Sequence, residues 1–103
     1  MQISANLGLL YTELRLPARI HAAARDGFDA VECHFPYAHE PSEIRGALDP
    51  TGLPMLALNT RPGDLELGEF GLAALPGRSG EARDAVAQAV SYGAAIGAGA
   101  VHV

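Results

Sequence analysis

The sequence predicts an α/β fold made of parallel βα units. Short apolar or alternating segments are separated by alanine-rich amphipathic segments, in the order β-α-β-α-β-α-β. Each unit is roughly 25 to 45 residues long, which leaves enough chain for a helical crossover between consecutive strands. Such crossovers favour parallel strands with right-handed connections.

Simple local patterns mark the first elements. Residues 2–7 alternate apolar and polar side chains, which is typical of a short strand. Residues 16–27 predict a helix, because Pro17 suits its first turn, alanine is dense and Gly27 can end it. Residues 28–35 are rich in β-forming residues and predict a second strand.

The next helix and strand follow the same plan. Residues 41–52 predict a short helix that begins at Ser42 or Pro41 and ends at Asp49 and Pro50. Residues 53–60 are almost all apolar, as expected for a strand that is covered on both faces.

The last helix, residues 79–97, has the clearest pattern in the sequence, and a fourth strand begins at residue 100. Because the sequence stops within that buried strand, we expect residues 1–103 to be the N-terminal portion of a larger domain. The residues expected on the apolar face of the last helix are Val86, Ala89, Val90 and Ile96.

Residues 61–78 form a long segment between the third strand and the last helix. The segment contains glycine and proline, but it also carries four leucines and Phe70, so a plain solvent loop fits it poorly. We favour a folded flap over the mouth of the sheet. A surface for another subunit is the alternative.

The composition disfavours several classes of protein. The net charge is −5 and the seven basic residues, all arginine, are scattered, so no nucleic-acid or anionic-membrane surface is expected. Cys33 is the only cysteine, which excludes an internal disulfide and a multi-cysteine zinc site. The sequence shows neither a signal-peptide pattern nor an apolar run long enough for a membrane span, so we expect a cytoplasmic protein.

Polar residues near the carboxyl ends of the predicted strands indicate a candidate site. Side chains alternate across a strand, and each strand places one or two polar groups opposite its bulky aliphatic residues. By this alternation Asn59 shares a face with Met55 and Ala57, opposite Leu56 and Leu58. At the mouth of a parallel sheet such groups converge where βα enzymes place their chemistry. The predicted substrate-binding residues are Asn6, Glu32, Asn59 and His102.

Each of these residues also has a structural alternative. Asn6 and Asn59 could equally bond to loop backbone, and His102 could be a core histidine. For Glu32 we favour function over an ion pair, because an ionised carboxylate inside a sheet is costly unless it is paired or used. His34 belongs to the same face, and we interpret it as a solvent-facing rim residue.

Other candidate sites are weak. His34, His39 and Glu40 do not by themselves have a spacing that predicts a metal site. The glycine-rich run "GAAIGAGA" precedes a strand instead of following one, so it does not indicate dinucleotide binding. Cys33 lies on the aliphatic face and is interpreted as inert packing.

Four segments together resemble a known enzyme family. They are "ANLGLLYTE", "GFDAVECHFPY", "LNTRPGDLELGEFGLAALPGR" and "YGAAIGAGAVHV". In register over all 103 residues, the sequence is similar to the N-terminal part of hydroxypyruvate isomerases and the related 2-oxo-tetronate isomerases. The most distinctive part is the loop pattern N-T-x-P-G-D, G-E-x-G and A-x-x-P-G-R.

Two loop positions depart from the family. Leu65 replaces an aromatic residue and Phe70 replaces an arginine. If that arginine holds an anionic substrate or a loop contact, its replacement by Phe70 changes specificity or activity.

The resemblance implies the first three and a half units of a (β/α)8 TIM barrel of the xylose isomerase-like group. It implies interconversion of hydroxypyruvate and tartronate semialdehyde, or of a related small hydroxy-keto acid, through an enediolate. It further implies a divalent metal, Mg²⁺ or Mn²⁺, and two acid–base glutamates, all supplied by later strands. No catalytic or metal-binding residue is therefore assigned within residues 1–103, and we expect the isolated chain to be inactive.

Two other functions remain as alternatives. The first is a noncatalytic half-barrel that binds a partner, or forms a homo-oligomer through its open sheet edges or the 61–78 loop. The second is a sugar epimerase or an endonuclease-like member of the same barrel group, which the loop pattern and the acidic charge disfavour.

Overall fold

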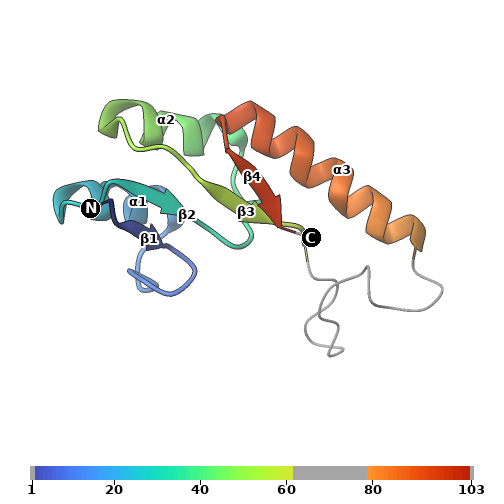
Figure 1. Ribbon diagram of the computed structural model, residues 1–103, viewed down its shortest axis with the longest axis horizontal. Helices are drawn as coiled ribbons and strands as arrows, with labels where there is room; N and C mark the ends of the chain where they lie inside the picture. Colours follow the sequence, from blue (N-terminus) through green and yellow to red (C-terminus); the bar gives the residue numbers. More distant parts are fainter. Residues whose placement is uncertain (1, 62–78, 103) are drawn as a thin grey trace.

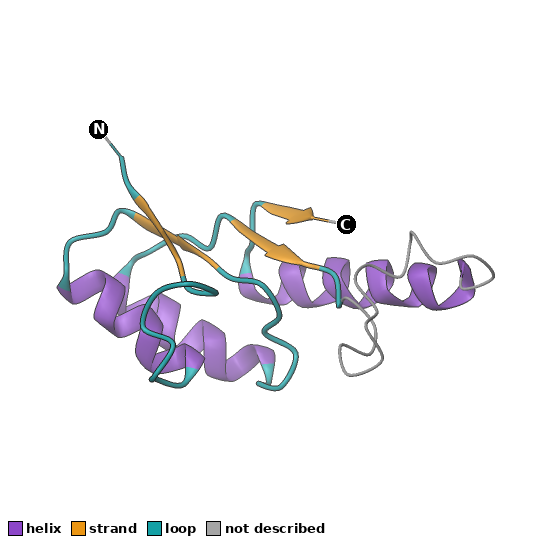
Figure 2. Ribbon diagram, turned by 90° about the horizontal axis from the view of Figure 1, so that it is seen from below, coloured by secondary structure: helices purple, strands orange, loops and turns teal. Residues whose placement is uncertain are grey.

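The computed structural model describes residues 2–61 and 79–102. In this part of the chain the helices lie together on one face of a sheet of short strands (Figure 1, Figure 2). The predicted flap, with Leu65 and Phe70, lies outside the described residues. The elements are β1 Ser4–Asn6, α1 Leu16–Arg25, β2 Ala30–Glu32, α2 Pro41–Thr51, β3 Ala57–Asn59, α3 Ser79–Ile96 and β4 Ala100–His102.

The described strands are all parallel. β1 pairs with β2 and β3 pairs with β4, and a parallel bridge between Val31 and Met55 joins the two pairs. The strand order is therefore β1-β2-β3-β4, which confirms the predicted parallel βα units. Each strand has only three residues, so the predicted strands were too long, and Ile3 and Phe35 beyond their ends are exposed.

The pairing between β2 and the segment that leads into β3 contains one extra residue. The amide of Val31 donates to the carbonyl of Pro54 at 3.0 Å, whereas the amide of Cys33 donates to the carbonyl of Ala57 at 3.1 Å. Between these two hydrogen bonds the donor segment advances by two residues, from 31 to 33, whereas the acceptor segment advances by three, from 54 to 57. One additional residue on one strand is the pattern of a β-bulge.

The bulge changes which side chains of this segment are buried. Met55 and Leu58 are both buried, with 2% and 0% of their surface exposed, whereas Leu56 is 43% exposed. The predicted alternation, which grouped Leu56 with Leu58 and Asn59 with Met55, is wrong because the bulge shifts the side-chain order by one residue.

The core lies between the sheet and the helices. In α3 the buried residues follow helical spacing, but Val90 is 55% exposed, so its predicted place on the apolar face is wrong. Val86 and Val90 each lie one residue beyond the buried row, about 100° around the helix. The buried residues of α3 are Ala85, Ala89, Tyr92, Gly93 and Ile96.

The end of α2 also differs from the prediction. The helix passes through Pro50 and ends at Thr51, instead of ending at Asp49 and Pro50. Gly52 follows with a φ of 71°, and its amide donates to the carbonyl of Leu48 at 3.0 Å. The left-handed glycine therefore ends this helix.

Candidate functional site

A cavity of about 270 Å³ lies at the carboxyl ends of the strands, and all four predicted substrate-binding residues line it. The strand register explains why they meet. Asn6 is paired with Glu32, and Asn59 is paired with His102, so each pair projects from the same face of the sheet. The predicted convergence is therefore confirmed, while substrate binding stays a prediction. The lining residues are Asn6, Glu32, Cys33, His34, Ala57, Asn59 and His102.

The side chain of Asn6 makes a structural contact through its oxygen, and its nitrogen has no hydrogen bond within the described residues. Its Oδ1 accepts a hydrogen bond from the amide of Gly8 at 2.9 Å, which closes a tight turn after β1. The carboxamide nitrogen is then the part of Asn6 that remains to face the cavity, and it is a donor only. Asn6 can therefore hold the loop and donate to a ligand oxygen at the same time.

The other three predicted residues differ from Asn6 in their contacts. Within residues 2–61 and 79–102, the side chains of Glu32, Asn59 and His102 form no hydrogen bond or ion pair with the protein. Glu32 is half-buried and lies in the middle of this set. Its carboxylate, which has no ion-pair partner among the described residues, is an acceptor that a ligand in the cavity could use.

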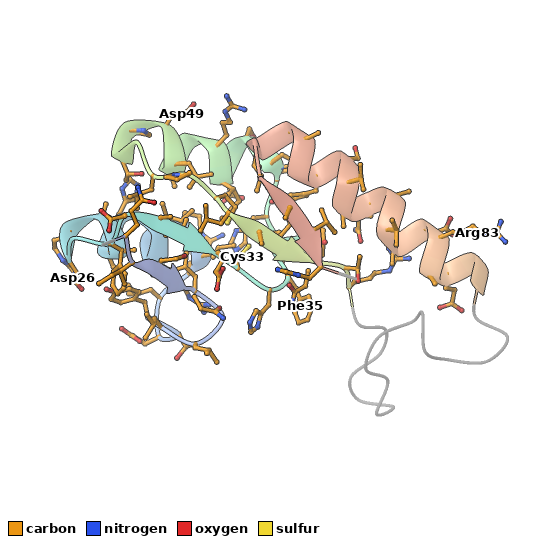
Figure 3. All side chains as sticks on the ribbon, in the orientation of Figure 1. Asp26, Cys33, Phe35, Asp49 and Arg83 are labelled. Atoms are coloured by element: carbon orange, nitrogen blue, oxygen red, sulfur yellow. The ribbon has the colours of Figure 1, made fainter. Side chains whose placement is uncertain are left out.

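His34 belongs to the cavity as well, although the sequence suggested a solvent-facing rim position. Its ring lies over the backbone of Gly8 and forms a tilted contact with Phe35, with ring centroids 5.8 Å apart. Figure 3 shows Phe35 just beyond the strand ends. His34 also lines a second cavity of about 330 Å³, together with Arg19 and His39. His34 thus lies between the two cavities.

Arg19 shapes the loop that joins β1 to α1. Its guanidinium donates to the carbonyls of Leu14 at 2.7 Å, Leu7 at 2.8 Å and Thr12 at 3.1 Å. The fork of guanidinium donors can satisfy three backbone carbonyls at once, which few other side chains can do. Arg19 therefore fixes the loop that follows Asn6.

Two tyrosines that the sequence analysis did not single out fix the loop between β2 and α2. Tyr92 of α3 donates its hydroxyl to the carbonyl of His39 at 2.8 Å and approaches that of Pro36 at 3.1 Å. Tyr37 donates to the main-chain carbonyl of Asn59, and the two rings pack edge to face with centroids 5.4 Å apart. Burial raises the pKa of Tyr37 and of Tyr92 to about 12, so both hydroxyls are protonated donors at neutral pH.

The described residues do not form a metal site by themselves. Among them, no group of three or more His, Cys, Asp or Glu side chains is close enough to hold an ion. The thiol of Cys33 is buried, and desolvation raises its pKa to about 12, so without a bound ion it is protonated at neutral pH.

The helices of the described residues are also too short or too polar to cross a membrane.

The chain is similar to two isomerases and to one protein of known structure. The 2-oxo-tetronate isomerase of Cupriavidus necator is 45% identical over 102 residues, which is 99% of this chain and 39% of that protein. The hydroxypyruvate isomerase of Escherichia coli is 40% identical over 97 residues, which is 94% of this chain and 38% of that protein. A crystal structure of an AP endonuclease, family 2, from Brucella melitensis matches with a TM-score of 0.91 and 36% identity, over 100% of this chain and 40% of that chain.

The chain thus spans about two fifths of the length of the relatives it matches. The family profile described as xylose isomerase-like TIM barrel matches residues 20–103, and the parallel βα units agree with that architecture. The chain belongs to the xylose isomerase-like TIM barrel family.

Proposed function

We propose that these residues are the N-terminal part of a hydroxypyruvate isomerase-like enzyme, which interconverts hydroxypyruvate and tartronate semialdehyde. The observation that carries this proposal is the cavity shared by Asn6, Glu32, Asn59 and His102 at the carboxyl ends of parallel strands. Barrel enzymes bind their substrates at this end of the strands. Similarity to proteins named hydroxypyruvate isomerase and 2-oxo-tetronate isomerase supports the choice of reaction.

The reaction moves a carbonyl group between two adjacent carbons of a small hydroxy-keto acid. A base must remove a proton from the carbon that carries the hydroxyl, and the negative charge of the enediolate must be held. The amide groups of Asn6 and Asn59 can donate hydrogen bonds to substrate oxygens, and Glu32 can accept one from a hydroxyl. In this proposal these residues orient the substrate, and the proton transfer belongs to residues outside this chain.

The proposal includes a divalent metal, Mg²⁺ or Mn²⁺, whose ligands lie outside residues 1–103. It also includes a cytoplasmic location, in line with the expectation from the sequence.

The test is an isomerase assay of the full-length enzyme with hydroxypyruvate and with a 2-oxo-tetronate. Glu32→Gln and Asn59→Ala are expected to raise KM about tenfold or more, since the first replaces a charged acceptor with a weaker neutral one and the second removes a substrate hydrogen bond. Asp49→Asn is the matched control for Glu32→Gln: it also removes one negative charge, but Asp49 lies at the far end of α2 (Figure 3). Kinetic constants for Glu32→Gln that equal those of Asp49→Asn contradict the proposal.

A noncatalytic oligomerisation module is the second candidate. The observation in its favour is that the outer edges of β1 and β4 pair with no other strand of the described residues. Size-exclusion chromatography and thermal unfolding of the 103-residue chain test this candidate. One discrete oligomer that melts cooperatively favours this candidate. Aggregation or poor folding favours the first proposal, in which these residues are part of a larger barrel.

A further inference from the structure

Asn59, the last residue of β3, has a main chain that is held on both sides of its α-carbon. Its amide donates to the carbonyl of His34 at 2.9 Å, and its carbonyl accepts the hydroxyl of Tyr37. The next amide, that of Thr60, donates to the carbonyl of His102 at 2.9 Å. Hydrogen bonds at the end of β3 therefore connect it to the residue after β2, His34, and to the end of β4, His102.

Tyr37 is itself held in place by α3. Its ring packs edge to face on Tyr92 at an interplanar angle of 80°, and only 8% of the surface of Tyr92 is exposed. Tyr92 is anchored in turn through its hydroxyl to the loop carbonyls. A second link runs from Arg61 to Gln88 of α3, at 2.9 Å. The contacts thus run from α3 through Tyr92 and Tyr37 to the peptide group of Asn59.

We propose that Tyr37 is a positioning residue for the candidate site. The main-chain hydrogen bonds of Asn59 hold the backbone from which its side chain reaches the cavity, and this side chain has no hydrogen bond to the described part of the protein. A binding group must be held to within about 0.5 Å of its productive position. The hydroxyl of Tyr37 supplies this restraint, and it acts on the substrate only through Asn59. The kinetic part of this inference rests on the proposed function.

The test begins with Tyr37→Phe in the full-length enzyme. This variant keeps the ring against Tyr92 and removes only the donor to Asn59. KM is expected to rise about three- to tenfold, the effect of one neutral hydrogen bond, with kcat within about twofold of the parent enzyme. Tyr11→Phe is the matched control, since it also loses one phenol hydroxyl, which donates to Asp26 at 2.6 Å, but Tyr11 lines neither cavity. Its KM is expected to stay within about twofold of the parent value.

A double variant separates positioning from a general loss of stability. In an Asn59→Ala background, Tyr37→Phe is expected to change KM no further, because the residue it positions has been removed. The melting temperature is expected to fall by a similar amount in both phenylalanine variants. A Tyr37→Phe enzyme with unchanged KM, or one whose effect on KM persists in the Asn59→Ala background, overturns the inference.

An NMR measurement decides the inference even if the parent enzyme turns over neither substrate, a result that would refute the proposed function alone. In asparagine-labelled full-length protein, Tyr37→Phe is expected to shift the carbonyl carbon and the side-chain amide signals of Asn59. Tyr11→Phe is expected to leave the side-chain amide signals in place. Unshifted Asn59 signals in Tyr37→Phe overturn the positioning role.

Discussion

A methyl group on Gly8 would overlap the imidazole ring of His34. A Cβ atom built on Gly8 lies 2.3 Å from Nδ1 and 2.6 Å from Cγ of that ring. Since the overlap includes Cγ, turning the ring about its own bond does not relieve it, and the whole side chain must move. The φ of Gly8 lies outside the left-handed region, so space and not backbone conformation requires glycine here.

Gly8→Ala is therefore expected to lower the free energy of unfolding by about 1–3 kcal/mol, as overpacking does elsewhere. Most of this loss is expected to disappear in a His34→Ala background, because the clashing ring is absent. Denaturant unfolding of the parent, both single variants and the double variant measures the coupling.

Gly46→Ala is the control for this pair. Gly46 lies within α2, and a Cβ atom built there meets nothing within 4 Å. Alanine is expected to raise the free energy of unfolding by about 0.5–1 kcal/mol, because glycine is a poor helix former. A Gly8→Ala protein as stable as Gly46→Ala would contradict the packing of His34 on Gly8.

The sequence predicted the order of the elements and the meeting of four polar residues. Both depend on local patterns, since side chains alternate along a strand and parallel strands end at one edge of the sheet. Asn6 and Glu32 could be placed on this basis alone. The bulge beside β3 could not, because it is defined by hydrogen bonds to a strand more than twenty residues away, and no glycine marks it.

The contacts of His34 and Tyr37 were not predicted, for a related reason. Both residues lie after the end of β2, and alternation placed His34 on the face of Glu32 but named no partner for either side chain. Their neighbours, Gly8 and Tyr92, come from segments distant in the sequence. Tyr37 in "HFPY" was a usable signal for such a contact. A tyrosine beside a predicted site commonly has a hydrogen-bond partner when its ring is packed against the protein.

Arg19→Lys is expected to destabilise the loop between β1 and α1. A lysine ammonium cannot reach three carbonyls that the guanidinium contacts together, so a loss of about 1.5–3 kcal/mol in the free energy of unfolding is expected. Arg25→Lys is the control, because the side chain of Arg25 is 73% exposed and approaches only Asp26. Its effect is expected to be within about 0.5 kcal/mol. Equal effects of the two substitutions would show that the loop contacts contribute little.

Cys33 is expected to react slowly with thiol reagents. Its surface is only 4% exposed, and burial raises its pKa from 9.0 to about 12, so very little thiolate is present at pH 8. Ellman's reagent is expected to react at least about a hundredfold more slowly with the folded chain than with the chain in denaturant. Subtracting the rates of a Cys33→Ala variant isolates the signal of Cys33 in the full-length protein. Native and denatured rates within tenfold of one another would show that the thiol is accessible.

The phenols of Tyr37 and Tyr92 and the thiol of Cys33 predict that stability falls at alkaline pH. Burial raises the pKa of Tyr37 and Tyr92 from 10.0, and that of Cys33 from 9.0, to about 12 in each case. The unfolded chain loses these protons first, so their contribution to stability is complete below about pH 9 and is lost as the pH rises toward 12. Urea unfolding at pH 8, 9, 10 and 11 measures the decline.

The variants assign this decline to individual groups. Cys33→Ala is expected to remove the part that begins near pH 9, because only the thiol of the unfolded chain ionises there. Tyr37→Phe and Tyr92→Phe are each expected to reduce the slope above pH 10, where the unfolded phenols ionise. If stability stays constant from pH 8 to 11, the phenols ionise as readily in the folded protein as in water. The hydroxyl of Tyr37 would then be solvated, and it could not restrain the peptide group of Asn59.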